Sequence, residues 1–316
     1  MRRGEHGGDW AAYQIQYHGM PLDFSANVSP MGVPAGVKRA LYQAVEEVNR
    51  YPDPLCRQLR ACLGRYHDVS SAQILCGNGA SDLIDRLVLA LRPKRGMVTA
   101  PAFSEYGQAL RRVGCQVEEF PLQRAEDFRV TARILERITP ALDILFLCEP
   151  SNPAGQTTDR TLLEKILERC DACGVLLVVD ECFEEFLLDR SHSMVSNLTG
   201  HHLLILRAFT KFYGLAGVRL GYCLCQEETL LEQMRLAGQP WPVSHLAQAA
   251  GMAALEETAY GDQLRAWTWR RREALRLALT QLGYSVSEIY GTVTDENFVY
   301  VQRLSELAPE LRVYSN

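Results

Sequence analysis

Lys211 lies in an apolar, glycine-rich stretch, AFTKFYGLAGVRLGY (208–222), directly after Thr210 and eight residues before Arg219. A buried lysine amine can attack an aldehyde, and a hydroxyl together with a guanidinium group can bind a phosphate. Most lysines at the ends of strands are solvated surface residues that do no chemistry. The stretch therefore indicates either a surface corner or a site for a phosphorylated aldehyde, and the elements that position it have to distinguish the two.

Short apolar runs alternate with helical patterns through most of the chain, and the two periodicities predict buried strands and amphipathic helices. The runs that we expect to form strands are 96–101, 142–150, 174–181 and 202–209. The segments with helical spacing include 37–48, 81–91 and 161–174. This alternation predicts a mostly parallel sheet with helices on both faces, and ligands bind such sheets at the carboxyl ends of the strands.

Polar or aromatic residues follow the other predicted strand ends. GNGASD (77–82) follows a short apolar run and opens a helix, and Tyr106 closes PAFSEY after another run. Asn152 and Asp180 follow the next two runs. Each motif alone is weak, because glycine turns, Asn-Pro turns and exposed carboxylates are common at strand ends. Their order within one alternating sheet, together with the lysine, is far more specific.

The combined set contains the groups that pyridoxal 5′-phosphate (PLP) requires. Lys211 would form a Schiff base with its aldehyde, and Asp180 would pair with its protonated pyridine nitrogen. Tyr106 would stack on the ring, and Asn152 would donate to the phenolic oxygen. The phosphate would bind at the helix N-terminus and to hydroxyl and guanidinium groups. Those phosphate-binding residues are Gly79, Ala80, Ser81, Thr210 and Arg219.

The composition is that of a globular enzyme. With 316 residues, of which 47% are hydrophobic and 22% charged, the chain can bury a sizeable core. The net charge of −5 argues against partners such as nucleic acid or an anionic membrane. We expect no signal peptide and no membrane helix, because no stretch contains the roughly 20 apolar residues that a membrane helix needs. The ten cysteines are scattered apart from one C-x-x-C, Cys170 and Cys173, so we expect no metal site and a cytoplasmic location.

These motifs resemble the fold type I PLP enzymes, and within them the aminotransferase class I/II group. The resemblance is greatest to the L-threonine-O-3-phosphate decarboxylases of cobalamin biosynthesis, a family related to the histidinol-phosphate aminotransferases. It covers nearly the whole chain and implies a large domain with a mostly parallel central sheet and a smaller α+β domain. The matching segments are 6–8 (HGG), 22–32, 50–54, 77–82, 101–107, 148–155, 180–186, 207–222 and 239–251.

The resemblance also implies residues that the strand ends do not supply. In this family the tyrosine that matches Tyr51 reaches the cofactor phosphate of the neighbouring subunit, which implies a homodimer. The segments that match His6, Gly7 and Asn27 lie over the substrate, a small phosphorylated amino acid or amine, although a short glycine-rich arm could also be disordered. Asn152 would contribute to the substrate site as well as to the cofactor site.

The chain is expected to divide into three parts. Residues 1–35 would form an N-terminal arm and part of the small domain, 36–225 the large PLP-binding domain, and 226–316 a linking helix and the C-terminal small domain. The small domain reads as incomplete, because a single strand-like stretch would hardly complete it. Arg312 matches the first of two family arginines that bind the anionic substrate, and the second would lie beyond Asn316.

The cofactor set does not decide the reaction, because the bond to Cα that breaks is the one held perpendicular to the cofactor ring. We expect decarboxylation of L-threonine O-3-phosphate to (R)-1-aminopropan-2-ol O-2-phosphate. Three features favour this reaction. They are the HGG arm, the PWPVS segment, and Phe183, where histidinol-phosphate aminotransferases usually have tyrosine. One alternative is an aminotransferase acting on histidinol phosphate or a related amino acid. The other is a catalytically impaired PLP-binding relative, an alternative that the absence of the second arginine favours. In addition, Ala208 lies where the family often has a hydroxyl near the cofactor phosphate, so one hydrogen bond to the phosphate would be missing.

Overall fold

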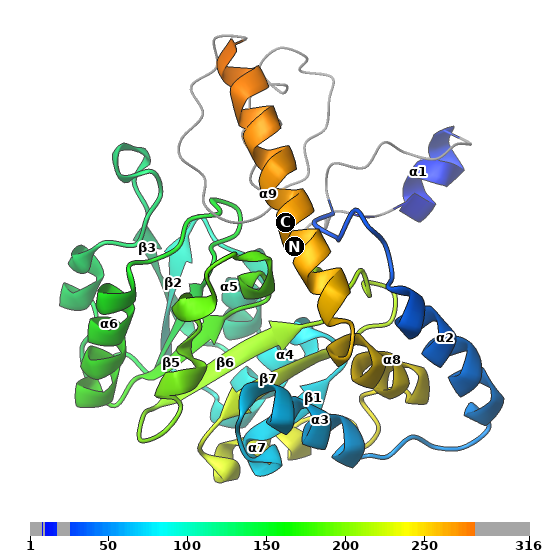
Figure 1. Cartoon of the computed structure of the whole chain (residues 1–316). Coiled ribbons are helices and arrows are strands. Elements are labelled where there is room, and N and C mark those ends of the chain that lie inside the picture. Colours follow the sequence, from blue (N-terminus) through cyan, green and yellow to red (C-terminus); the bar gives the residue numbers. More distant parts are fainter. Residues whose placement is uncertain (1–7, 9, 18–25, 282–316) are drawn as a thin grey trace.

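The computed structural model describes residues 8, 10–17 and 26–281, which Figure 1 draws as ribbons. Four sequence predictions lie outside the described residues. They concern His6, Gly7, Arg312 and the strand-like stretch 296–302. The described part contains the whole region that was predicted to bind the cofactor.

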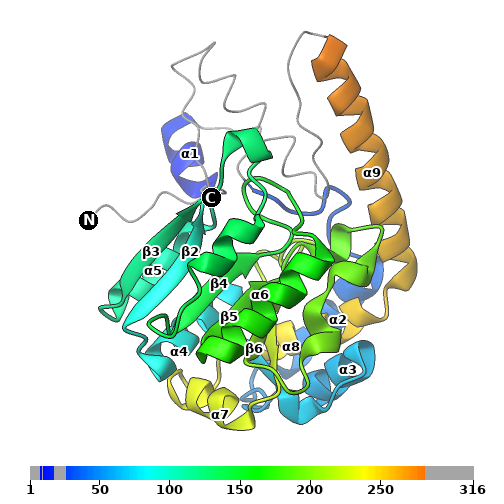
Figure 2. The same cartoon turned by 90° about the vertical axis from the view of Figure 1, so that its left-hand side faces the viewer.

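A seven-stranded sheet lies at the centre of the structure (Figures 1 and 2), in the order β1–β7–β6–β5–β4–β2–β3. The strands are β1 (Ile74–Gly77), β2 (Arg95–Ala100), β3 (Gln116–Pro121), β4 (Ile144–Cys148), β5 (Leu176–Asp180), β6 (Leu203–Ala208) and β7 (Gly221–Cys225). β7 pairs antiparallel with both β1 and β6, and the other neighbouring strands pair in parallel. The predicted mostly parallel sheet is confirmed.

Helices cover both faces of the sheet. The α-helices are α1 (Trp10–Tyr17), α2 (Ala35–Ala44), α3 (Arg57–His67), α4 (Ala80–Leu91), α5 (Ser104–Arg112), α6 (Arg160–Cys173), α7 (Glu228–Leu236), α8 (His245–Leu255) and α9 (Thr258–Gln281). Short 3₁₀ turns are η1 (Val45–Glu47), η2 (Ser71–Gln73), η3 (Arg124–Glu126), η4 (Ala132–Glu136), η5 (Glu184–Phe186), η6 (Arg190–His192) and η7 (Met194–Asn197). Apolar residues of α4, α5 and α7 share one core cluster, and those of α3, α6 and α8 share the other.

The two core clusters explain why the central strands read as continuous apolar runs. Every residue of β4, β5 and β7 is buried. Phe146 and Val178 belong to the cluster under α4 and α5, whereas their neighbours Leu147 and Val179 belong to the cluster on the opposite face. A strand with helices on both of its faces has no polar side, so the alternation typical of half-exposed strands is lost.

The sheet brings several strand ends to one edge. Cys148 lies opposite Asp180 at the ends of β4 and β5. Gly77, at the end of β1, and Ala208, at the end of β6, both lie opposite Gly221 at the start of β7. Because β7 runs in the reverse direction, the loop that precedes it meets the residues that follow the parallel strands. The loops predicted to carry the site therefore converge.

Local sequence signals set the ends of the helices. Asp159 accepts a hydrogen bond from the N–H of Leu162 at the start of α6, and Gly174 follows the helix with a φ of +68°. Ser244 accepts a bond from the N–H of Ala247 at the start of α8. No helix in the described ranges has the combination of length and apolar character needed to span a membrane.

The strands and helices predicted from apolar periodicity within the described residues are confirmed, with ends that shift by a few residues. The helical region expected from residue 226 onward forms α7, α8 and α9, and Figure 1 shows α9 extending away from the sheet. Strands β3 and β7 were not predicted. β3 is an edge strand with two glutamates, and β7 follows the lysine stretch without a break, so neither has a pattern of its own.

Candidate active site

Lys211 lies in the loop after β6, at the edge where the strand ends converge. Its carbonyl oxygen accepts a hydrogen bond from the N–H of Ser29 at 2.9 Å, and the hydroxyl groups of Ser29 and Tyr260 are 2.6 Å apart. These bonds fix the lysine loop between the N-terminal segment and α9. Burial lowers the pKa of the Lys211 amine, although the charge of Asp180 acts in the opposite direction. A lower pKa increases the fraction of neutral amine, the form that attacks an aldehyde.

Asp180 ends β5 with a carboxylate that is almost completely buried. The hydroxyl of Tyr106 donates to Oδ2 at 2.6 Å, and the backbone N–H of Cys182 donates to Oδ1 at 3.0 Å. The two donors fix the plane of the carboxylate, and each oxygen keeps a lone pair for a further donor. Burial raises the pKa of Tyr106 well above its usual value, so the phenol stays protonated and remains a donor at neutral pH.

The N-terminus of α4 forms the anion-binding side of the site. The first N–H groups of an α-helix have no partner within the helix, and its dipole favours an anion there. Gly79 precedes the helix with a φ of +84°, and a Cβ on it would lie 2.6 Å from Nη2 of Arg219. A Cβ on Gly221 would lie 2.6 Å from the backbone N of Ala80. The two glycines therefore let the arginine and β7 approach the helix N-terminus.

A cavity of about 290 Å³ opens among these groups. Its walls include most of the residues predicted from the strand ends. These are Ala80, Ser81, Tyr106, Asn152, Asp180, Thr210, Lys211 and Arg219. The structure thus brings together an amine, a buried carboxylate, an amide and an anion-binding helix end around one space of the size used by small ligands.

Two residues that the family resemblance suggested do not line the cavity of this chain. Asn27 is partly exposed and does not line the cavity, although its neighbours Ala26 and Val28 do, as does Gly8. Tyr51 lies outside the cavity, with 82% of its surface exposed. Neither residue is therefore part of the cavity wall formed by the described residues of a single chain.

Two aromatic residues near the start of α5 line the cavity. The ring of Tyr106, predicted to stack on the cofactor, lies parallel to that of Phe146, with the ring centroids 5.1 Å apart, and its hydroxyl is bonded to Asp180. Phe103 meets Tyr106 edge to face at 5.5 Å and is only partly buried. Phe103 is a further candidate for stacking, which the sequence motifs did not indicate. Its place three residues after the end of β2 was the available signal.

A buried ion network supports the segment that follows Asp180. Arg207 of β6 donates to Glu181 at 2.5 Å and to Glu184 at 2.8 Å, and all three side chains are almost completely buried. The network fixes both ends of the turn that contains Phe183, whose ring centroid lies 5.7 Å from Nζ of Lys211. Breaking a buried pair of this kind leaves an unpaired charge and costs about 3–5 kcal/mol. The sequence motifs did not indicate roles for Glu181, Glu184 or Arg207.

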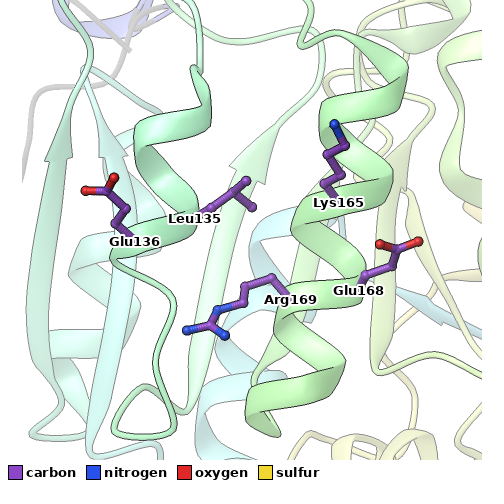
Figure 3. A pocket seen from close by; sticks show the side chains of 5 residues that line it. All are labelled: Leu135, Glu136, Lys165, Glu168 and Arg169. Atoms are coloured by element: carbon purple, nitrogen blue, oxygen red, sulfur yellow. The ribbon is translucent and has the colours of Figure 1, made fainter.

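A second hollow lies on the surface between η4 and α6, away from the strand ends (Figure 3). Its charged residues are two acids and two bases, and Arg169 donates to the carbonyl oxygen of Ile138 at 2.9 Å. All four charged side chains are exposed, in contrast to the buried carboxylate of Asp180. Among the described residues, no group of three or more His, Cys, Asp or Glu side chains could hold a metal ion. The cavity beside Lys211 is therefore the candidate active site.

Comparison with known proteins agrees with this geometry. The model of the aminotransferase class I and II family matches residues 20–313. The chain belongs to this family. It is 40% identical over 263 residues to the threonine-phosphate decarboxylase of Salmonella typhimurium, covering 83% of this chain and 72% of that protein. It is 33% identical over 243 residues to the histidinol-phosphate aminotransferase of Bacillus subtilis, covering 76% of this chain and 67% of that protein.

Solved structures of the family share the fold. The histidinol-phosphate aminotransferase of Clostridium acetobutylicum superposes with a TM-score of 0.79 at 24% identity, covering 85% of this chain and 79% of that one. The aspartate aminotransferase of Thermus thermophilus bound to maleate superposes with a TM-score of 0.77. The resemblance stated from the sequence motifs is confirmed, and with it the assignment as a PLP-dependent enzyme of fold type I.

Proposed function

We propose that this protein decarboxylates L-threonine O-3-phosphate to (R)-1-aminopropan-2-ol O-2-phosphate, a reaction of cobalamin biosynthesis. The observation that carries the proposal is the 40% identity to a threonine-phosphate decarboxylase over 83% of this chain. The identity to the histidinol-phosphate aminotransferase of Bacillus subtilis is lower, 33% over 76% of the chain. Both relatives are named for phosphorylated compounds, so a small anionic substrate suits either reading.

The residues of the cavity fit PLP. Lys211 would bond to the aldehyde carbon, and the buried carboxylate of Asp180 would pair with the pyridine nitrogen. The phosphate would occupy the N-terminus of α4, where the glycine at position 79 leaves room for Arg219. Asn152 would donate to the phenolic oxygen from the cavity wall. Once bound, PLP supplies an electron sink that stabilises the charge left at Cα when a bond there breaks.

The chain's own groups would then select and complete the reaction. A site that holds the substrate carboxylate perpendicular to the cofactor ring breaks the Cα–C bond and releases CO2, and one proton must then reach Cα. Nζ of Lys211 is the group in this cavity that could deliver that proton. Phe183, beside the amine, adds an apolar wall without a hydroxyl of its own.

A paired assay tests the proposal. The purified, PLP-loaded protein is given threonine phosphate or histidinol phosphate, with and without 2-oxoglutarate, and CO2 and amino transfer are both measured. Release of CO2 from threonine phosphate, with no need for 2-oxoglutarate, is the expected result. Amino transfer without CO2 would overturn the proposal in favour of the aminotransferase. Lys211→Ala should lose the visible absorption band of lysine-bound cofactor along with the activity.

The aminotransferase remains the second candidate function, and the family match together with the histidinol-phosphate aminotransferase relatives favours it. Both reactions would use the same cofactor and the same lysine. The orientation of the substrate, which the cofactor residues do not fix, separates them. Neither product from either substrate, despite bound PLP, would support a catalytically impaired relative instead.

Further parts of the proposal concern the assembly of the protein. We infer a homodimer in which Tyr51 reaches the cofactor phosphate of the partner subunit, because this residue is 82% exposed and lies outside the cavity of its own chain. We also propose that the substrate is bound by Arg312, His6, Gly7 and Asn27. The division into an N-terminal arm (1–35), a large PLP-binding domain (36–225) and a C-terminal part (226–316) belongs to the same proposal. A cytoplasmic location is supported by the ten cysteines, all within the described residues and all free.

A further inference from the structure

The exposed side chain of Tyr51 is held in one orientation by a neighbouring ring. Its ring stacks on that of Trp241, with the centroids 4.7 Å apart and an angle of 28° between the planes. The two residues are 190 positions apart in the sequence and lie on separate loops. Trp241 is itself 45% exposed, so the outer side of this aromatic pair faces away from the chain. Stacking restricts the rotamers of an exposed tyrosine, which would otherwise sample several orientations.

The two loops that carry the aromatic pair are tied together beneath it. The Nε2 group of Gln248 donates to the carbonyl oxygen of Asp53 at 2.9 Å and to that of Val243 at 3.1 Å. The carboxylate of Asp53 accepts the backbone N–H groups of Leu55 at 3.1 Å and of Arg57 at 2.7 Å. These bonds fix the loop that contains Tyr51 relative to α3 and α8. The positions of the two loops that carry Tyr51 and Trp241 are therefore fixed relative to each other.

Three exposed apolar side chains lie in the segment that precedes Tyr51 in the sequence. Tyr42, Val45 and Val48 are 77%, 51% and 55% exposed, and they follow one another at a spacing of three residues in α2, η1 and the turn after it. A spacing of three residues places side chains on one face of a helical segment, and a contiguous exposed apolar face marks an interaction surface. The continuity of this segment with Tyr51 favours a second copy of this chain as the occupant, because the proposed function already gives Tyr51 to the partner's cofactor site.

We propose that Trp241 is a positioning residue, which holds the phenol of Tyr51 in the orientation that binds the cofactor phosphate of the partner subunit. The inference rests on the proposed function for the role of Tyr51. Trp241 itself does not line the cavity of its own chain. Its contribution lies in restricting Tyr51, so that the phenol loses little rotational freedom when the phosphate binds.

The first test compares the affinity for PLP with that for pyridoxal, which lacks the phosphate. We expect Trp241→Ala to weaken PLP binding about 3–10-fold, with little change for pyridoxal, because one aromatic contact is lost. Trp241→Phe keeps a ring and should retain most of the affinity. Tyr51→Phe should show the same phosphate-specific loss, and the double variant Tyr51→Phe/Trp241→Ala should lose little more than Tyr51→Phe alone. Trp269→Ala is the matched control, since this tryptophan is 41% exposed on α9.

The second test uses hybrid dimers of two differently tagged chains, one with Lys211→Ala and the other with Trp241→Ala. If Trp241 acts across the interface, the site that keeps its lysine receives both aromatic residues from the Lys211→Ala chain. The hybrid should therefore show wild-type PLP affinity at half of the sites, measured by the absorption band of lysine-bound cofactor. Weak binding at that site would place Trp241 in its own subunit's site and overturn the inference.

The outcomes separate this inference from the proposed function. If Tyr51→Phe weakens PLP binding but Trp241→Ala does not, the inference about Trp241 fails and the role of Tyr51 stands. If Tyr51→Phe has no effect, both the role of Tyr51 and the inference fail, while the reaction remains open to the paired assay. Sedimentation of each variant must show the wild-type assembly. Should Trp241→Ala not fold, a Trp241→Leu variant with wild-type affinity would equally refute the inference.

Discussion

The hydrogen bond between Tyr106 and Asp180 allows a quantitative prediction. The bond is 2.6 Å long, within the range of strong O–H···O⁻ bonds, and both partners are buried. A hydrogen bond to a charged group contributes about 1.5–3 kcal/mol, and Tyr106→Phe removes the donor while keeping the ring. We therefore expect the free energy of unfolding of the cofactor-free protein to fall by about 2 kcal/mol, measured by urea denaturation at pH 7.

Tyr222→Phe is the matched control for this prediction. The hydroxyl of Tyr222 lies 2.8 Å from Nε2 of His67, and both side chains are largely buried. Burial lowers the pKa of His67 to about 3, so the imidazole is neutral at pH 7 and the bond joins two neutral groups. Such a bond contributes about 1 kcal/mol. If Tyr106→Phe costs no more than Tyr222→Phe, the carboxylate of Asp180 does not depend on Tyr106, and the positioning role given to the phenol is refuted.

Three further predictions follow from buried groups and from one glycine. The pKa of His67 is about 3 in the folded protein and about 6.5 in the unfolded chain, so its contribution to the free energy of unfolding is complete above pH 6.5. About 2 kcal/mol of that free energy should be lost by pH 5. Urea unfolding of His67→Gln should therefore depend less on pH over this range. Burial raises the pKa of Glu149 to about 7 from about 4.5, so the free energy of unfolding should fall by about 2.5 kcal/mol as pH rises from 5 to 8. An unchanged slope in urea unfolding of Glu149→Gln would contradict this. In Gly79→Ala the new Cβ would lie 2.6 Å from Nη2 of Arg219, so the affinity for PLP, measured by titration, should fall at least tenfold. Gly200→Ala is the control, because Gly200 also has a positive φ (+83°) but no atom lies within 4 Å of its Cβ position, and its affinity for PLP should not change.

The fold and the cofactor side of the site could be predicted because they depend on local patterns. A strand with helices on both faces must be apolar throughout, and a parallel sheet must bring its carboxyl ends to one edge. Those two constraints predict from the sequence that Asp180, Asn152 and Lys211 lie near one another at one edge of the sheet. Strand β3 was missed because an edge strand tolerates polar residues such as Glu118 and Glu119, which hide the pattern.

The parts that were missed depend on contacts between distant segments. Nothing in PAFSEY indicates that the hydroxyl of Tyr106 reaches Asp180, 74 residues later in the chain, or that Phe103 rather than its neighbours lines the cavity. The stacking of Tyr51 on Trp241 likewise joins two loops that have no common sequence pattern. Side-chain direction at a loop is set by the packing of the whole domain, so the composition of a loop identifies candidates without assigning their roles.

The same distinction applies to the reaction. The groups proposed to bind the cofactor lie at strand ends, where the backbone geometry fixes them, and a change in any of them should affect decarboxylation and transamination alike. The turn after β5 is different, because the ion pairs of Arg207 with Glu181 and Glu184 fix both ends of the segment that presents Phe183 to the amine of Lys211. An apolar ring at this position contributes no hydroxyl, so the orientation of the substrate must depend on other groups. The residues that determine which of the two reactions occurs should therefore lie on the substrate side of the cavity, and not include Lys211 or Asp180.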